Sequence, residues 1–150
     1  MTPDILNRRN IIGAASLLVA AAASGAVEAQ AATGQLTIHI LDLFSGFPAS
    51  GVVVDLARKD GETYRPLKSV TTAVSGRSDA GPLLKGAEFT AGRYQLTFNL
   101  SEYFRSVDKS LPANFFRKIV LEFEVTDASQ PHHVPLQCTP WTQACSVLPG

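Results

Sequence analysis

Five stretches of this chain alternate apolar with more polar residues, and this pattern limits the possible folds more than any other feature. In the first stretch, Leu36, Ile38 and Ile40 recur at every second position. Successive side chains of a β-strand point to opposite faces of a sheet, so a period of two predicts strands with one buried face. The other four runs cover 52–56, 94–100, 119–125 and 134–138, and shorter strands are expected at 68–73 and 87–90.

Glycine-containing breaks separate these strands at fairly regular intervals, which favours an antiparallel β-sandwich. One segment, 101–107, has the character of a helix, with Ser101 as the expected N-cap and Glu102 near the positive end of the helix dipole. We find no internal repeat and no sign of a second domain. The sequence therefore predicts an all-β fold, a two-sheet antiparallel β-sandwich with one short helix.

The first thirty or so residues have the layout of a signal peptide. Arg8 and Arg9 stand shortly before the apolar run 14–23, which is shorter than the roughly 20 apolar residues needed to span a bilayer. Small residues permit cleavage before Gln30 or Ala32, and we take 1–31 as the signal and 32–150 as the mature domain. The paired arginines resemble a twin-arginine signal, with a general secretory signal as the alternative. Either route predicts a periplasmic or secreted protein without a stable membrane anchor.

The charge balance argues against a nucleic-acid partner. The chain has 13 basic and 13 acidic residues, and loss of the signal removes two of each sign, whereas nucleic-acid-binding proteins usually show a basic surplus or stripe. The mature length suits one small domain with a thin core, which oligomerisation would help to stabilise.

Cys138 and Cys145 are the two cysteines of the chain. In an oxidising compartment they could form a disulfide, if the turn at Thr139 and Pro140 brings their Cα atoms within roughly 4.4–6.8 Å. The alternative is a pair of buried thiols that pack as small apolar residues. The sequence leaves both open.

Two histidines stand out because they are out of phase with the apolar positions of their strands. His39 and His133 should therefore face away from the core, where each taken alone would be an ordinary solvated side chain. The same outer faces carry Leu41 and Pro135, and this partly apolar surface suggests a subunit interface. A neutral imidazole with a pKa near 6.5 is a suitable general base at neutral pH.

Arg77 lies in a glycine-flanked loop, where its guanidinium could hold a planar anionic group through paired donors. By itself it would be a solvated loop arginine. The adjacent His132 and His133 should point to opposite faces of their strand and do not easily close on one metal ion. With no cysteine cluster, phosphate-binding loop or serine elbow in the sequence, we expect neither a metal nor a cofactor.

Several ordered motifs run through nearly all of the mature chain. They are Leu36-Thr37-Ile38-His39-Ile40-Leu41-Asp42, Gly46-Phe47-Pro48-Ala49, Ser75-Gly76-Arg77 with Gly81-Pro82-Leu83-Leu84, Gly92-Arg93-Tyr94, Tyr103-Phe104, and His132-His133-Val134-Pro135-Leu136 with Thr139-Pro140-Trp141. In this order they resemble the 5-hydroxyisourate hydrolase family, relatives of transthyretin.

The resemblance implies a transthyretin-like sandwich, a homotetramer, and catalytic roles for His39, Arg77 and His133. It also implies an activity: hydrolysis of the N1–C6 amide of 5-hydroxyisourate, a step in urate degradation, with a histidine activating water and Arg77 holding the substrate or the developing oxyanion. The small-molecule partner would be 5-hydroxyisourate or a related planar ring.

The chain departs from the family at its C-terminus. The family's closing Tyr-Arg-Gly-Ser is replaced by Ser146, Val147, Leu148 and Pro149, which resembles the apolar tail of transthyretin. An altered tail could admit a different ring. The alternative to an enzyme is therefore an exported carrier or sensor that binds a small planar molecule without turning it over, or, less specifically, a structural accessory domain.

Overall fold

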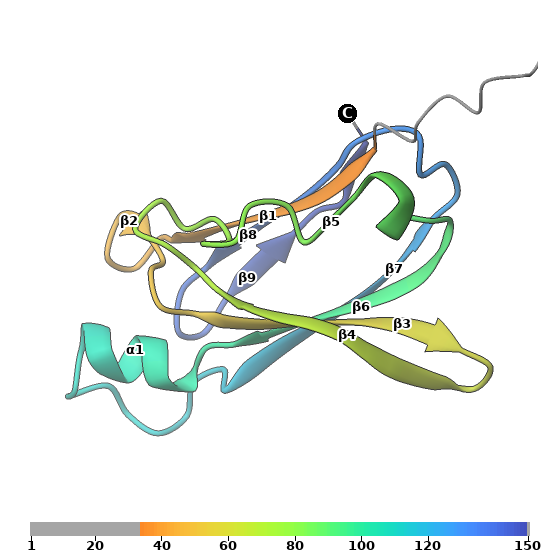
Figure 1. Ribbon diagram of the computed structural model, residues 1–150. Coiled ribbons are helices and arrows are strands. Elements are labelled where there is room, and N and C mark those ends of the chain that lie inside the picture. The colour runs from red at the N-terminus through yellow and green to blue at the C-terminus, as the bar shows by residue number, and fades with distance from the viewer. Residues whose placement is uncertain (1–33, 150) are drawn as a thin grey trace, which may run out of the picture.

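Two β-sheets packed face to face, with one short helix at one end, form the part of the chain that the computed structural model describes, residues 34–149 (Figure 1). The alternating runs become strands because each can bury one face against the other sheet. The strands are β1 Gln35–Asp42, β2 Phe47–Pro48, β3 Val53–Asp60, β4 Thr63–Thr71, β5 Leu84–Lys85, β6 Gly92–Asn99, β7 Lys118–Val125, β8 His132–Cys138, β9 Gln143–Cys145 and β10 Leu148–Pro149; the helices are a 3₁₀ turn at Gly86–Glu88 and α1 Ser101–Val107.

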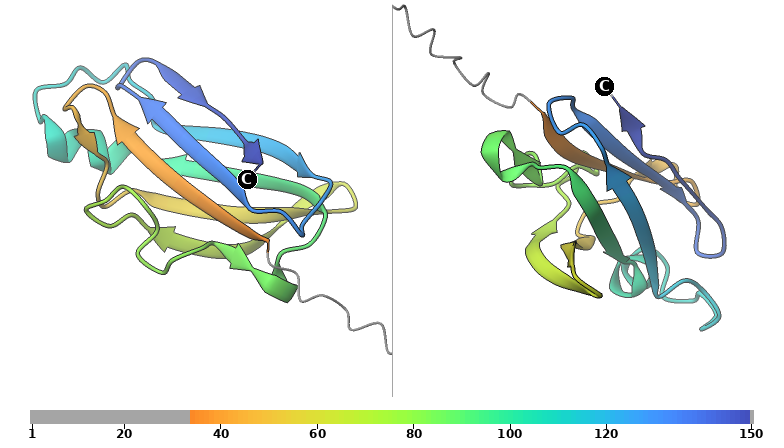
Figure 2. Two further views of the ribbon diagram at one scale, coloured as in Figure 1. Left: turned by 90° about the horizontal axis from the view of Figure 1, so that it is seen from above. Right: turned by 90° about the vertical axis from the view of Figure 1, so that its right-hand side faces the viewer.

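The first sheet has the order β10-β8-β1-β2, with β5 paired to β1 and β9 to β8, and the second has the order β4-β3-β6-β7. The prediction of a wholly antiparallel sandwich is wrong at one place, because β1 and β8 run parallel (Figure 2). A tight hairpin forces its two strands to be antiparallel. β1 and β8 come from opposite ends of the described chain, so no hairpin constrains their direction.

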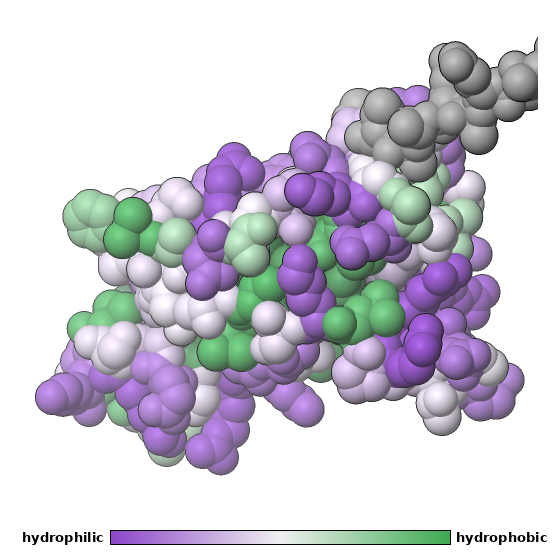
Figure 3. All heavy atoms as spheres, viewed as in Figure 1, coloured by the Kyte–Doolittle hydropathy of each residue, from purple (hydrophilic) through white to green (hydrophobic). Residues whose placement is uncertain are grey.

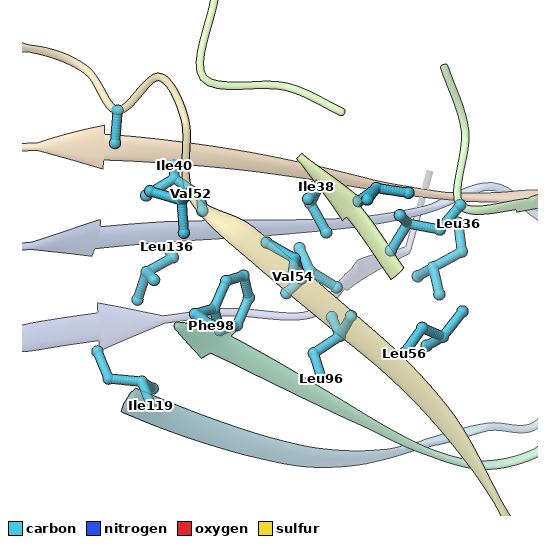
Figure 4. Close-up of a cluster of buried hydrophobic side chains, with 14 of the residues drawn as sticks. Leu36, Ile38, Ile40, Val52, Val54, Leu56, Leu96, Phe98, Ile119 and Leu136 are labelled. Atoms are coloured by element: carbon cyan, nitrogen blue, oxygen red, sulfur yellow. The ribbon is translucent and has the colours of Figure 1, made fainter. Parts of the chain in front are cut away.

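The core lies between the sheets and follows the predicted phase. Leu36, Ile38 and Ile40 of β1 are at most 1% exposed, and they face residues such as Leu96 and Phe98 from the second sheet (Figure 4). Burying each such side chain contributes about 1.5–3 kcal/mol. The intervening residues of β1 are only partly buried and face outward, which places His39 on the outer surface of the first sheet.

The helix and its neighbouring turn fix the end of β1. The Tyr103 hydroxyl of α1 donates to Asp42 Oδ2 at 2.9 Å, and the Phe44 backbone N–H donates to Asp42 Oδ1 at 2.8 Å. Asp42 is 1% exposed, and burial next to this carboxylate raises the pKa of Tyr103. A buried carboxylate with two donors is satisfied, so β1 ends at a fixed point three residues after His39.

Three local predictions are corrected by the structure. Segment 87–90 is not a strand: its first two residues belong to the 3₁₀ turn Gly86–Glu88, where the φ of 55° at Gly86 interrupts extended backbone. The helix is present over the predicted residues, but its N-cap is Leu100, without a side-chain cap, and Ser101 is its first residue. The strand expected at 68–73 starts earlier, at Thr63, because it forms a hairpin with β3.

The predicted signal peptide, residues 1–31, lies outside the described residues. Between residues 34 and 149 no helix has the length and apolar character needed to cross a membrane.

The two cysteines are unpaired thiols. In the β8–β9 pair, Cys138 lies opposite Gln143 and Cys145 lies opposite Leu136, so the cysteines are diagonal neighbours. Diagonal positions are about 7–8 Å apart, whereas a disulfide needs Cβ atoms about 3.5–4.5 Å apart. This register favours the free-thiol alternative.

Candidate active site

The parallel pairing of β1 and β8 brings the two predicted histidines together. Thr37 lies opposite His133, and His39 lies opposite Pro135 two residues further along. The imidazole rings of His39 and His133 are 6.4 Å apart between centroids and inclined by 40°. Both rings therefore belong to one patch on the outer face of the first sheet, as the sequence predicted.

Arg77 reaches this patch because its loop lies against β1. The Ile40 backbone N–H donates to the Gly76 carbonyl at 2.8 Å. A Cβ atom on Gly76 would lie 2.3 Å from the Ile40 carbonyl oxygen and 3.3 Å from Cδ2 of His39, and its φ of +72° also favours glycine. The glycine thus permits the close approach that places Arg77 next to the histidines.

The electrostatics of the patch favour neutral imidazoles. Burial, and after it the charge of Arg77, lowers the pKa of His39, although a hydrogen bond to the Ser75 backbone opposes the shift. Burial, then the charges of Arg77 and His39, lowers the pKa of His133. Desolvation and a nearby positive charge both disfavour the imidazolium form. Both rings are then neutral at neutral pH and can accept a proton.

A cavity of about 340 Å³ adjoins this patch. Arg77 and His133 line it directly, and His39 lies beside it through its contact with the His133 ring. The C-terminal residues complete the wall, because Leu148 lies opposite His133 and Pro149 lies opposite His132 in the β10–β8 pair.

The sequence did not predict that Thr37 contacts His133, nor that Leu148 forms a short strand opposite it. β10 has only two residues, too few for an alternating pattern. Thr37 carried one signal: it is out of phase with the core, two residues before His39, and therefore on the same face. The resemblance implied that the altered tail lines the site, and Leu148 and Pro149 do border the cavity.

His132 faces the other way, as expected for the neighbour of His133 on a strand. It is 9% exposed, its Nδ1 lies 3.0 Å from the Gln130 carbonyl oxygen, and its ring meets Phe89 edge-on at 5.5 Å. The described residues contain no group of three or more side chains able to hold a metal ion.

A larger hollow of about 550 Å³ lies on the second sheet, between β3, β4 and β6. Tyr64, Lys68 and Asp55 are among its lining residues, and none of the three predicted site residues contributes to it. Lys68 supplies a cation there, but no histidine lines this hollow, so it lacks the general base of the first patch.

Comparison with known proteins places the chain in a family. Residues 36–145 match the model of the HIUase/Transthyretin family. The chain is 42% identical to 5-hydroxyisourate hydrolase 2 of Rhizobium meliloti over 110 residues, which are 73% of this chain and 91% of the relative. It is 40% identical to 5-hydroxyisourate hydrolase of Deinococcus radiodurans over 107 residues, 71% of this chain and 89% of the relative.

Solved structures give the same fold. Transthyretin from Sparus aurata superposes with a TM-score of 0.68 at 20% identity, covering 77% of this chain and 97% of that one. (S)-allantoin synthase superposes with a TM-score of 0.69 at 34% identity, but the match covers 80% of this chain and only 45% of the synthase. On this sequence match and this shared sandwich, the chain belongs to the HIUase/transthyretin family.

Proposed function

We propose that this protein hydrolyses 5-hydroxyisourate to 2-oxo-4-hydroxy-4-carboxy-5-ureidoimidazoline, a step in urate degradation. The observation that carries the proposal is the meeting of His39, Arg77 and His133 on one outer face beside a cavity. The names of the relatives, 5-hydroxyisourate hydrolases at about 40% identity, support the same substrate.

The chemistry is the opening of a cyclic amide by water. A neutral histidine takes a proton from water while the water oxygen bonds to C6, and the C6 carbonyl oxygen becomes an oxyanion. Arg77, a permanent cation with paired donors, stabilises that charge or holds the planar ring. The C6–N1 bond then breaks as N1 receives the proton from the histidine, and C6 becomes a carboxylic acid that releases its proton to solvent.

His39 and His133 are the two groups able to serve as the base. A positioned base accelerates such a step by roughly 10²–10⁴-fold, and one oxyanion-stabilising donor by about 10²–10³-fold. No redox change and no cofactor enter this reaction.

A non-catalytic carrier is the second candidate, and the tail is the observation that favours it. Leu148 and Pro149 give the cavity an apolar wall where the resemblance implies Tyr-Arg-Gly-Ser. A planar ring could bind against such a wall through contact area alone, without any group for turnover.

The assay that separates the two candidates follows the ultraviolet absorbance of freshly generated 5-hydroxyisourate. A hydrolase accelerates the decay above the rate in buffer, in proportion to protein concentration. A carrier binds urate, a stable planar analogue, in equilibrium dialysis and leaves the decay rate at the buffer value.

We also propose a homotetramer. Large apolar side chains are exposed where β1 meets β2, including Leu43 at 59% and Phe47 at 71%, and Phe44 packs edge-on against Trp141 at 6.1 Å. Figure 3 shows apolar residues gathered at this end of the molecule. Exposed clusters of this kind mark interaction surfaces. A tetrameric mass by light scattering at micromolar concentration supports the proposal, and a monomer contradicts it.

Export to the periplasm or beyond is proposed from Arg8, Arg9 and the apolar run that follows. A reporter fused to residues 1–32 should stay in the cytoplasm when both arginines are replaced by lysine. Unchanged export of that variant would exclude a twin-arginine signal and leave the general secretory route.

A further inference from the structure

The hydroxyl of Thr37 contacts one ring nitrogen of His133, Nδ1. Thr37 Oγ1 lies 2.9 Å from His133 Nδ1 and 3.4 Å from the backbone carbonyl oxygen of His132. The two residues are directly opposite in the β1–β8 pair, and both side chains are half-buried on the outer face. The contact is therefore built into the sheet register.

The direction of the hydrogen bond to His133 follows once the hydroxyl donates to the His132 carbonyl. A carbonyl oxygen can only accept, and a threonine hydroxyl has a single proton to donate. If the hydroxyl donates to the His132 carbonyl, it can meet His133 Nδ1 only as an acceptor. His133 must then carry its proton on Nδ1, and its Nε2 has a free lone pair.

We propose that Thr37 is a positioning residue, which holds neutral His133 in the Nδ1–H tautomer and thereby leaves Nε2 as the base toward the cavity. The expected effect on kcat rests on the proposed hydrolase function, whereas the expected tautomer of His133 does not. Free neutral histidine prefers the Nε2–H tautomer, in which Nε2 cannot accept a proton. The hydroxyl supplies the partner that reverses this preference.

His39 provides the contrast within the same site. A hydrogen bond to the Ser75 backbone raises the pKa of His39, so the ring donates this bond and a carbonyl oxygen accepts it. A backbone carbonyl is not removed by changing a side chain. His133, held by a hydroxyl, is thus the histidine whose tautomer a single substitution can alter.

The test replaces Thr37 by valine, which keeps the β-branched shape and removes the hydroxyl, and by serine, which keeps the hydroxyl. We expect Thr37→Val to lower kcat for 5-hydroxyisourate by on the order of 10–100-fold, as when the partner of a functional histidine is lost. KM should change little, and Thr37→Ser should retain kcat within a few-fold. Thr97→Val, which removes a half-buried hydroxyl from β6 of the other sheet, should leave kcat unchanged.

Nitrogen-15 NMR of the histidine side chains reads the tautomer directly and without turnover. The wild type should show His133 protonated on Nδ1 at a pH where the ring is neutral, and Thr37→Val should shift it toward Nε2. A wild-type His133 protonated on Nε2, or a Thr37→Val protein with unchanged kcat and tautomer, would overturn the inference. If the wild type has no hydrolase activity, the proposed function fails, and the NMR spectra still decide the role of Thr37.

Discussion

Leu148 lies directly opposite His133 in the antiparallel pair of β10 and β8. Opposite residues of such a pair share one face of the sheet, so the leucine side chain borders the same cavity as the imidazole. In the resemblance to the hydrolases, this position belongs to the glycine of Tyr-Arg-Gly-Ser. Because leucine is larger and more apolar than glycine, this tail should leave a narrower cavity with a more apolar wall than Tyr-Arg-Gly-Ser would.

Replacing Leu148 by alanine should widen the cavity and raise kcat/KM for 5-hydroxyisourate, by on the order of 10-fold if one large side chain obstructs the ring. Leu67→Ala on β4, a substitution of another exposed leucine, is the control and should have no effect. Equal steady-state kinetics for both variants and the wild type would show that Leu148 does not limit access. A single substitution perturbs the fold less than replacing residues 146–149 by Tyr-Arg-Gly-Ser, because Val147 packs against the core and an arginine there would bury charge.

The lowered pKa values of His39 and His133 predict the pH profile. A base must be neutral, and both rings stay neutral to a lower pH than the ordinary value of 6.5. We expect kcat/KM to be flat above about pH 6.5 and to fall only in more acidic buffer. A rate that already falls between about pH 8 and pH 7 would contradict neutral histidines as the bases.

The same shifts affect stability with a defined sign. As pH falls below 6.5, the unfolded chain takes up protons before the folded one, so stability present above the unfolded pKa is lost on acidification. The double variant His39→Ala/His133→Ala should therefore show a weaker decrease of Tm with acid than the wild type. Parallel Tm profiles would indicate that these histidines do not titrate differently in the folded state.

Gly76→Ala should disrupt the loop that carries Arg77, because the new Cβ would lie 2.3 Å from the Ile40 carbonyl oxygen at a φ of +72°. Gly81→Ala is the matched control, since Gly81 has a φ of +78° but no atom within 4 Å of the added Cβ. Left-handed backbone alone costs about 1–2 kcal/mol. Gly76→Ala should lose more stability than Gly81→Ala in urea unfolding and should also lose activity. Equal losses would show that the close approach to β1 is unimportant.

Both cysteines should remain thiols that react slowly in the folded protein. Burial raises the pKa of Cys138 to about 12, and burial also raises the pKa of Cys145. Because the thiolate is the reactive form, labelling with a thiol reagent should become rapid only in denaturant. A mass two units lower for the untreated protein, reversed by reductant, would instead demonstrate a disulfide and a shifted β8–β9 register.

The sequence predicted the sandwich and the outward direction of two histidines because both depend on strand phase, whereas Arg77 was selected from its glycine-flanked loop and from the family resemblance. His39 and His133 could be assigned to an outer face from alternation alone, and the structure confirms that they lie together. The parallel direction of β1 and β8 could not be predicted, because alternation reports which face a residue occupies and not which strand lies beside it. The contact of Thr37 with His133 depends on that pairing, so it became visible only in the structure.

The decay rate of freshly generated 5-hydroxyisourate, measured with the wild type, His39→Ala, His133→Ala and Arg77→Lys at equal concentration, tests the central claim most directly. The account predicts a wild type well above the buffer rate and roughly 10²–10⁴-fold losses for the alanine variants. It also predicts a defective lysine variant, because lysine lacks the two-donor fork. Folding should be nearly unchanged, since outward-facing substitutions usually alter stability by less than about 0.5 kcal/mol. A wild type that decays the substrate no faster than buffer, or variants as active as the wild type, would contradict it.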